Sequence, residues 1–516
     1  MANKGLFAST VGRFLPAPNV LNREWASAYE YGSEHKLAQL VATGTLQDNF
    51  YSTAQGQLGE VLEAAQKVEP IFVARAAVYA RGRGVMKDMP ALLAAYLTVA
   101  EPDLAVRVFD RVIDNGRMLR NFVQIMRSGV VGRKSLGTRP KRLVQQWLER
   151  ASMRTLMHAA TGSDPSLADI VKMVHPKPAD EGRKAFYAWL IGKPYDFDDL
   201  PAEIAAFEAW KHYQSGPLPD VPFEWLTAFE LSPEYWAELA SRMGWQALRM
   251  NLNTLARKGA FGVEGTAEMV AARLSDEEAL TKARVLPYQV MVALGSVGED
   301  VPLKVQAALE SALEASLSKV PALDGEVVVC PDVSGSMISP VTGYRKGASS
   351  KVRCIDVAAL ISAAVLRRNP RAELLPFEQE VVELKLKPSA RVAVNAAKLA
   401  SIGGGGTNVS APLAELNKRR ANVDLVVIVS DNQSWVDAAR VGATATMREW
   451  EKLKNRCPQA KLVCIDLQPY GTTQAANRKD ILNVGGFSDA VFETLSTFAS
   501  GEGDRDWVAE VKEMEV

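Results

Sequence analysis

Five side chains in the C-terminal third of the chain have the chemistry and the spacing to hold a hard divalent cation. Asp332, Ser334 and Ser336 alternate along one segment, so in an extended turn they project to the same side. Thr407 follows a run of four glycines, and Asp431 follows an apolar run. Carboxylate and hydroxyl oxygens are the ligands that Mg²⁺ prefers. We therefore predict a metal site formed by Asp332, Ser334, Ser336, Thr407 and Asp431, with Mg²⁺ as the expected ion.

The serines of this segment allow two other interpretations. An Asp-x-Ser-x-Ser segment also occurs as an ordinary polar turn, and a serine acts as a nucleophile when a base activates it. The four histidines, at positions 35, 158, 175 and 212, all precede the C-terminal third, which therefore has no imidazole base of its own. We expect no catalytic residues and no enzymatic activity. Two carboxylates leave an octahedral cation unsaturated, so an acidic group of a partner could complete its shell.

A second group of residues suits contacts with phosphate. Residues 115–148 contain no Asp or Glu, although the whole chain carries 60 acidic residues, and the centre of this stretch is broken by glycines. Cations on a loop with hydroxyls nearby can bind a nucleic-acid backbone without reading its bases. A solvated charged surface is the alternative interpretation. The candidate nucleic-acid-binding residues are Arg120, Arg127, Arg133, Lys134, Arg139, Lys141 and Arg142, joined downstream by Lys172, His175 and Lys177.

The elements that must position the metal ligands alternate between strands and helices. Residues 326–330, 424–429 and 461–465 are short apolar runs, which predict buried parallel strands. Residues 350–368, 390–399, 411–418 and 438–453 have helical periodicity. Alternating strands and helices predict a doubly wound α/β sheet, in which ligands bind beyond the carboxyl ends of the strands. The polar segments after residues 330 and 429 lie at that position.

The preceding part of the chain is predicted to be all-helical. Apolar residues recur at helical spacing from about residue 58 to 320, and strand-like alternation is scarce. The predicted helices are 59–67, 71–80, 91–100, 105–127, 141–160, 167–174, 203–213, 233–242 and 301–320. Glycines and prolines separate them, which favours stacked helix pairs, with an irregular helical bundle as the alternative.

Composition narrows the class of protein further. The 516 residues include 60 basic and 60 acidic side chains, so nucleic-acid binding would have to come from local clustering of charge. The four cysteines, at positions 330, 354, 457 and 464, lack metal-like spacing and are interpreted as structural. We find neither a signal peptide nor an apolar run of about 18 residues. A cytoplasmic protein with no membrane partner is expected.

The two parts together resemble the Ro (TROVE-domain) ribonucleoprotein family. The metal set resembles the metal-ion-dependent adhesion site (MIDAS) of von Willebrand factor A domains. The matching segments are NFYST at 49–53, AAVYAR at 76–81, GVVGR at 129–133, VHPKP at 174–178, VPFEWLT with ELSP at 221–233, and VIVSDN at 427–432. The resemblance implies an α-helical TROVE domain over residues 1–323, built as a ring of HEAT-like repeats. A von Willebrand factor A-like domain over residues 324–516 would close that ring.

The same resemblance implies a function. Ro-family proteins bind small noncoding Y RNAs on the outer face of the ring and single-stranded ends of misfolded RNAs in its centre. The resemblance therefore implies a non-enzymatic role in RNA quality control. In bacteria this role involves cooperation with a 3′-to-5′ exoribonuclease such as polynucleotide phosphorylase. The alternative is a metal-dependent protein-interaction module, like other adhesion-site domains or chelatase subunits, in which the cation captures a carboxylate of a partner.

Overall fold

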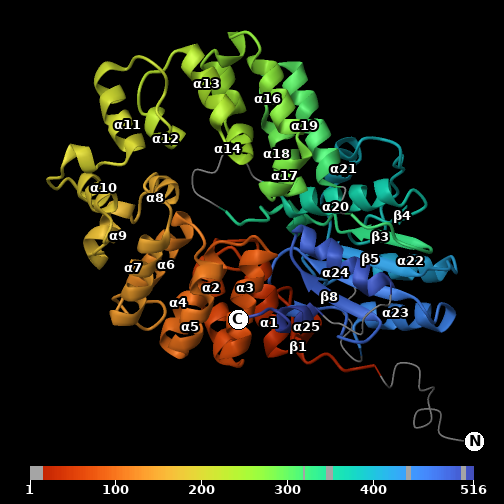
Figure 1. The fold of residues 1–516 in the computed structure, drawn as a ribbon. Helices are drawn as coiled ribbons and strands as arrows, with labels where there is room; N and C mark the ends of the chain where they lie inside the picture. The colour runs from red at the N-terminus through yellow and green to blue at the C-terminus, as the bar shows by residue number, and fades with distance from the viewer. Residues whose placement is uncertain (1–14, 318–319, 345–351, 437–442, 501–506) are drawn as a thin grey trace, which may run out of the picture.

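The protein combines a curved array of helices with a parallel β-sheet. The computed structural model describes residues 15–317, 320–344, 352–436, 443–500 and 507–516. Helices from the first three-fifths of the chain follow a curved path, and the sheet with its covering helices occupies the gap between the two ends of that path (Figure 1). The predicted fold class, a helical ring with an α/β domain, is therefore confirmed.

The sheet has five parallel strands in the order β4-β3-β5-β6-β8. The three predicted strands are present as β3, β5 and β6, whereas β4 and β8 were not predicted. Their bounds are β3 Val327–Pro331, β4 Glu373–Leu374, β5 Leu425–Ser430, β6 Lys461–Asp466 and β8 Ile481–Gly485. Because β3, β5 and β6 are adjacent and parallel, the segments that leave them emerge at the same edge.

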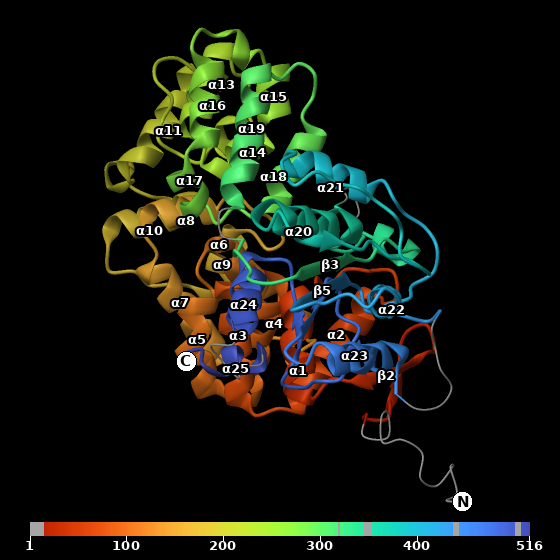
Figure 2. The same ribbon diagram turned by 90° about the vertical axis from the view of Figure 1, so that its right-hand side faces the viewer.

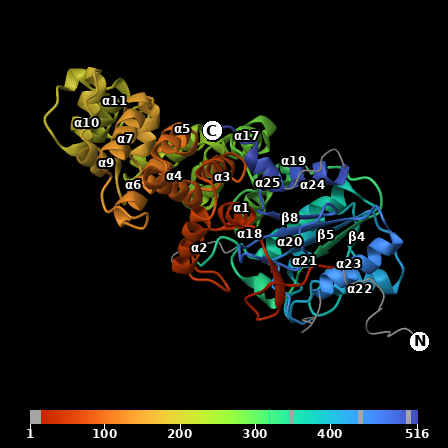
Figure 3. The same cartoon turned by 90° about the horizontal axis from the view of Figure 1, so that it is seen from below.

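Helices cover both faces of the sheet, as a doubly wound fold requires. Alternate residues of β3 pack on opposite sides: Val327 and Val329 face α20 and α21, and Val328 and Cys330 face α22 and α23. Figures 2 and 3 show this layering, with α22 and α23 on the side of the sheet away from the helical array. The helices are α20 Cys354–Arg368, α21 Val392–Ala400, α22 Ala411–Lys418, α23 Ala445–Arg456 and α24 Asp489–Ser500. The predicted helix starts at 350 and 438 lie outside the described residues.

The helical array runs from α1 to α19, with short 3₁₀ turns at Phe197–Asp199 and Ala260–Gly262. It meets the sheet region at both ends, because α1 contacts β8 while α18 and α19 contact α20 and α21. Its helices are α1 Ser33–Thr43, α2 Ala54–Gln66, α3 Pro70–Gly82, α4 Asp88–Ala100, α5 Pro102–Val112, α6 Gly116–Ser128, α7 Thr138–Arg150, α8 Met153–Ala159, α9 Leu167–Val174, α10 Glu181–Ile191, α11 Ala202–Tyr213, α12 Phe223–Leu226, α13 Pro233–Arg242, α14 Trp245–Met250, α15 Leu252–Arg257, α16 Thr266–Ser275, α17 Glu277–Lys282, α18 Pro287–Ser296 and α19 Leu303–Ser316. Pairing of these helices as HEAT-like repeats remains a prediction.

Two of the predicted helices were wrong in length, because each is a pair of helices. The predicted helix 105–127 is divided into α5 and α6, where the Asn115 side chain accepts a hydrogen bond from the Met118 amide and starts a new helix. The predicted helix 141–160 is divided into α7 and α8, where Ser152 caps the Thr155 amide in the same way. Apolar residues continue at helical spacing across both breaks, which hides them from periodicity alone.

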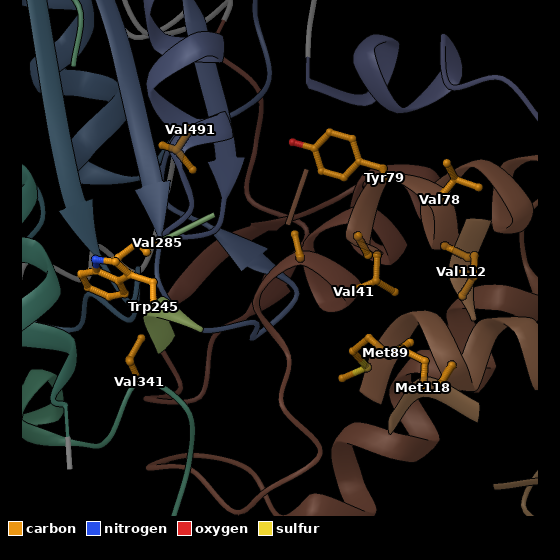
Figure 4. Packing of buried hydrophobic residues seen from close by; sticks show 14 of the residues in the cluster. Val41, Val78, Tyr79, Met89, Val112, Met118, Trp245, Val285, Val341 and Val491 are labelled. Atoms are coloured by element: carbon orange, nitrogen blue, oxygen red, sulfur yellow. The ribbon is translucent and has the colours of Figure 1, made fainter. Parts of the chain in front are cut away.

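One apolar core joins the helical array to the sheet. A single cluster of buried residues extends from α1 through the array and onto one face of the sheet. Figure 4 shows part of it, with Val41, Met89 and Met118 on the neighbouring helices α1, α4 and α6. The C-terminal helix α25, Trp507–Lys512, packs on α1 and α3, and the Trp507 indole donates a hydrogen bond to the Tyr79 hydroxyl at 2.8 Å.

The N-terminal segment belongs spatially to the sheet region. Strands β1 (Val20–Leu21) and β2 (Ser27–Glu30) form a hairpin, and β2 pairs with β7 (Thr472–Thr473), far along the chain. The boundary predicted at residues 323–324 lies between α19 and β3 and remains a prediction. Among the described residues, no helix is both long enough and apolar enough to cross a membrane. Cys330, Cys354 and Cys464 are buried and free, which fits a structural role.

Candidate functional site

The two predicted carboxylate ligands lie together because their strands are neighbours. Pro331 of β3 is paired with Val429 of β5 in parallel register. The Asp332 amide donates a hydrogen bond to the Val429 carbonyl at 2.9 Å, which holds the start of the first metal segment against the end of β5. Asp431 follows β5 directly. Both side chains therefore emerge at the same edge of the sheet.

The predicted hydroxyl ligands converge on the same place. The Thr407 hydroxyl donates to the Ser334 hydroxyl at 2.9 Å, and the Ser334 and Ser336 hydroxyl oxygens are 3.4 Å apart. The Gly335 amide donates to the Gly405 carbonyl at 3.2 Å. Gly405 has a φ of +69°, a backbone conformation that favours glycine. We call residues 332–336, 403–407 and 431–434 the metal loops.

The electrostatics of the metal loops favour a cation. Asp332 and Asp431 are 0% and 1% exposed. Burial raises the pKa of the Asp332 carboxyl, against hydrogen bonds from Ser334 and Ser430 that lower it. Burial and then the charge of Asp332 raise the pKa of Asp431. The Oδ2 atom of Asp431 is buried and has no hydrogen-bond partner in the structure. An ion of opposite charge would satisfy this oxygen.

The donor set fits a hard ion such as Mg²⁺. Within the described residues there is no group of three or more His, Cys, Asp or Glu side chains placed to hold a metal. A cation at the metal loops would therefore depend on two carboxylates, three hydroxyls and water. Oxygen-only ligands suit Mg²⁺ and exclude the soft sites preferred by zinc or copper.

Two polar residues beside the metal loops were not predicted. The Ser430 hydroxyl donates to Asp332 Oδ2 at 2.5 Å. Asp466, at the end of β6, is buried, and its Oδ2 accepts hydrogen bonds from the Tyr31 hydroxyl at 2.6 Å and from the Gln39 amide. Burial chiefly raises the pKa of Asp466 to about 8. Asp466 could have been found from sequence, because it follows a predicted strand just as Asp332 and Asp431 do.

The basic stretch forms the end of α6, the following loop and the start of α7. Gly129, Gly132 and Gly137 have φ values of +85°, +87° and +68°, so glycines supply the turns of this loop. Lys141 is half-buried. The remaining predicted side chains of this segment are exposed: Arg127, Arg133, Lys134, Arg139 and Arg142.

The downstream residues Lys172, His175 and Lys177 lie beside α7. All three are exposed at the end of α9, where His175 adopts a left-handed conformation with φ of +50°. Gln145 of α7 donates to the carbonyl of Val174 at 2.6 Å, so the end of α9 is attached to α7. We call Arg127, Arg133, Lys134, Arg139, Lys141, Arg142, Lys172, His175 and Lys177 the basic face.

Arg120 differs from the other predicted RNA-binding residues. It is half-buried, and its guanidinium donates to the Ala159 carbonyl at 2.7 Å. A Cβ atom on Gly162 would lie 2.0 Å from the Arg120 Cζ, so the guanidinium packs directly on that glycine. Arg120 thus has a structural contact that joins α6 to the end of α8.

One acidic residue of α5, Asp103, approaches the basic face in space. Arg139 Nη1 lies 3.4 Å from Asp103 Oδ1, and both side chains are exposed. An exposed pair of this kind contributes little to stability and is readily exchanged for a phosphate contact. The acid-free stretch of sequence is therefore only partly acid-free in the folded protein.

Comparison with known proteins places both regions in one family. A family model described as "Ro60 vWA domain" matches residues 326–499, and the "TROVE domain" model matches residues 183–345. The curated "RNA-binding protein RO60" of Deinococcus radiodurans is 25% identical over 518 residues, which cover 94% of this chain and 96% of that protein. The chain belongs to the Ro (TROVE-domain) family.

A solved Ro structure shares the fold. The crystal structure of the Deinococcus radiodurans RO (RSR) protein aligns with a TM-score of 0.60 at 22% identity, covering 92% of this chain and 100% of that one. Within this Ro-family chain, the metal loops lie in the part matched by the Ro60 vWA model. The basic face precedes residue 183, where the TROVE match begins.

Proposed function

We propose that this Ro-family protein binds RNA, with the basic face holding the phosphate backbone. The observation that carries the proposal is the gathering of exposed cations from α6, α7 and α9 on adjoining elements of a chain without net charge. Further support comes from the Deinococcus radiodurans relative, whose name describes an RNA-binding protein. Charged contacts to phosphate account for most non-specific affinity for nucleic acids.

The RNA class follows from the family. We propose small noncoding, Y-like RNA and the single-stranded ends of misfolded or structured RNA as ligands, in RNA quality control with a 3′-to-5′ exoribonuclease. The protein's own role would be non-enzymatic. His158, His175 and His212 lie in the helical array, and His35 stacks on Tyr31 with ring centroids 4.2 Å apart. The Ser334 hydroxyl accepts from Thr407 and lies beside the Ser336 hydroxyl, which supports a ligand role for the serine hydroxyls of the metal loops over a nucleophilic one.

Salt-dependent binding tests the RNA proposal. Electrophoretic shifts would use the full chain and a structured RNA with a single-stranded tail. Changing Arg133, Lys134 and Arg142 to Glu removes three exposed contacts, each worth up to about 1 kcal/mol, so affinity should fall roughly 10- to 100-fold. The slope of log K against log salt should become shallower by about 2, since each single-strand phosphate contact contributes about 0.7.

A charge-matched variant controls for net charge. Lys385, Lys398 and Lys418 are exposed on the sheet region, far along the chain from the basic face, and their change to Glu produces the same net charge. RNA affinity and salt slope should remain those of the wild type in this control. The proposal fails if the wild type binds no RNA at low salt, or if the two triple variants behave alike.

We also propose that the metal loops hold Mg²⁺ through Asp332, Ser334, Ser336, Thr407 and Asp431. The unpartnered Oδ2 of Asp431 supports this assignment. The ion would neutralise the two buried carboxylates and tie the three metal loops together. Anomalous scattering from a Mn²⁺-soaked crystal provides the test, and absence of a peak between Asp332 and Asp431 would overturn it.

A metal-dependent protein interaction is the second candidate function. It is favoured by the incomplete ligand set, because five side-chain oxygens leave a position open on an octahedral ion. Protein binding through this position should be abolished by EDTA and unaffected by nuclease. Nuclease-sensitive binding that persists in EDTA would leave RNA as the partner.

A further inference from the structure

One edge of the parallel sheet is turned away from the helical array. At the other edge, β8 contacts α1, whereas β4 lies at the outer end of the sheet (Figure 1). After β4 the chain turns back, since Phe377 and Val381 form an antiparallel bridge and the Val382 amide donates to the Pro376 carbonyl at 2.7 Å. The residues that follow, 382–387, therefore begin antiparallel to β4. We call residues 382–387 the edge segment.

The edge segment has the side-chain pattern of a β-strand. Three half-buried apolar side chains pack against the core, and they alternate with three exposed charged side chains. This period of two is typical of a strand with one buried face and one solvated face. The apolar residues are Val382, Leu384 and Leu386, and the charged residues are Glu383, Lys385 and Lys387.

The backbone of the edge segment lacks partners. Within the described residues, the amides and carbonyls of residues 383–386 make no hydrogen bond. Because the Val382 amide points to β4, the alternation of an antiparallel ladder turns the backbone groups of Glu383 and Lys385 to the outer side. The free stretch ends at the Lys387 carbonyl, which accepts from the Asn395 side-chain amide at 2.9 Å. An open strand edge of this kind is a template for pairing with another strand.

The charges of the edge segment are complementary to the same segment in reverse. In an antiparallel pair of two copies centred on Leu384, Glu383 of each copy lies opposite Lys385 of the other. Both side chains are free to meet a partner, since they are 87% and 92% exposed and only 3.7 Å apart in a weak pair of their own. A register centred on Lys385 would place two lysines opposite each other. Opposite charges stabilise a cross-strand pair and like charges destabilise it, which favours the Leu384 register.

We propose that two copies of this chain associate through their edge segments, paired antiparallel about a two-fold axis at Leu384. The outward amides and carbonyls of Glu383 and Lys385 would then bond across the interface, and the two sheets would become continuous. The proposal is independent of the RNA and metal sites proposed above. The contact is short and belongs to the small, weak class of interfaces, so we expect a dimer dissociation constant of about 1 to 100 µM.

Analytical ultracentrifugation of the full chain over a range of concentrations tests the proposal. The wild type should pass from monomer to dimer as concentration rises. Glu383→Lys places like charges at two symmetric positions of the interface and should raise the dimer dissociation constant roughly 10- to 100-fold. The control is Glu299→Lys, which makes the same charge change on an exposed loop between α18 and α19. This control should dimerise as the wild type does.

Mixing two variants provides an independent readout. Glu383→Lys and Lys385→Glu should each self-associate weakly, but an equimolar mixture should form heterodimers, because each position again faces an opposite charge. Fluorescent labelling of one variant allows the heterodimer to be followed by sedimentation. A wild type that stays monomeric at several hundred micromolar (about ten times the middle of the expected range) overturns the proposal. Equal dimerisation of Glu383→Lys and Glu299→Lys, or a mixture that associates no better than its components, also overturns it.

Discussion

Replacing Asp466 by Asn should change how stability depends on pH. The Asp466 carboxyl has a pKa of about 8 in the folded protein against an ordinary value of 3.8, chiefly because it is buried. The folded state therefore holds a proton that the unfolded chain releases, and the stability associated with that proton is lost as pH rises from about 4 through 8. An asparagine cannot ionise, and its amide oxygen can still accept the hydrogen bonds from Tyr31 and Gln39.

The size of the effect follows from the difference between the two pKa values. They differ by about four pKa units, and each unit corresponds to about 1.4 kcal/mol. The free energy of unfolding of Asp466→Asn, relative to the wild type, should accordingly rise by an amount on the order of 5 kcal/mol between pH 4 and pH 8. Below pH 4 the two proteins should differ only by the small cost of exchanging a carboxylic acid for an amide.

Urea denaturation in EDTA at several pH values measures this difference, and Asp480→Asn is the control. Asp480 is also buried in part, but hydrogen bonds from Arg478 and Trp450 outweigh that burial and lower its pKa. The stability that Asp480 contributes is present above its ordinary pKa and lost as pH falls, so its variant should show the opposite trend. A pH-independent difference for Asp466→Asn, or the same trend in both variants, would refute the reasoning.

Two glycine substitutions test close contacts beside the basic face. In Gly116→Ala the new Cβ would lie 2.3 Å from the Ala159 Cβ, so the free energy of unfolding measured in urea should fall by about 1 to 3 kcal/mol. Gly59→Ala, in open space on α2, should instead raise the free energy of unfolding by up to about 1 kcal/mol. Equal changes in the free energy of unfolding for Gly116→Ala and Gly59→Ala would contradict the close approach of α6 and α8. Gly162→Ala should displace the guanidinium of Arg120 and lower the free energy of unfolding by about 1 kcal/mol in the same assay. An unchanged urea midpoint would mean that the Arg120 guanidinium does not pack on Gly162.

The metal loops could be predicted because their signals are local. Asp332 and Asp431 each follow an apolar run short enough for a buried strand, and adjacent parallel strands bring their ends together.

Two helix pairs, α5 with α6 and α7 with α8, were each predicted as one helix because the local periodicity is ambiguous where they divide. Asn115 and Ser152 are residues that favour helix starts, but apolar spacing continued through both positions.

Features that depend on distant contacts could not be predicted from the same reasoning. The Asn22 side chain reaches the Ser434 carbonyl only when the N-terminal segment packs on the metal loops, which requires strands of two to four residues that lack a usable pattern. The basic stretch shows the converse problem. Sequence alone indicates unpaired cations, whereas the folded α5 places Asp103 next to Arg139.

The bond between Tyr31 and Asp466 joins residues 435 positions apart in the chain. A ribosome that adds about 5 to 20 residues per second needs roughly 20 to 90 seconds to make the second partner after the first. During that time β2 has an open edge, and the faces of α1 that later meet β8 and α25 have nothing to cover them. Nascent chains of this protein are thus exposed to chaperones and to self-association at β2 and α1, and the bond between Tyr31 and Asp466 can form only late in synthesis.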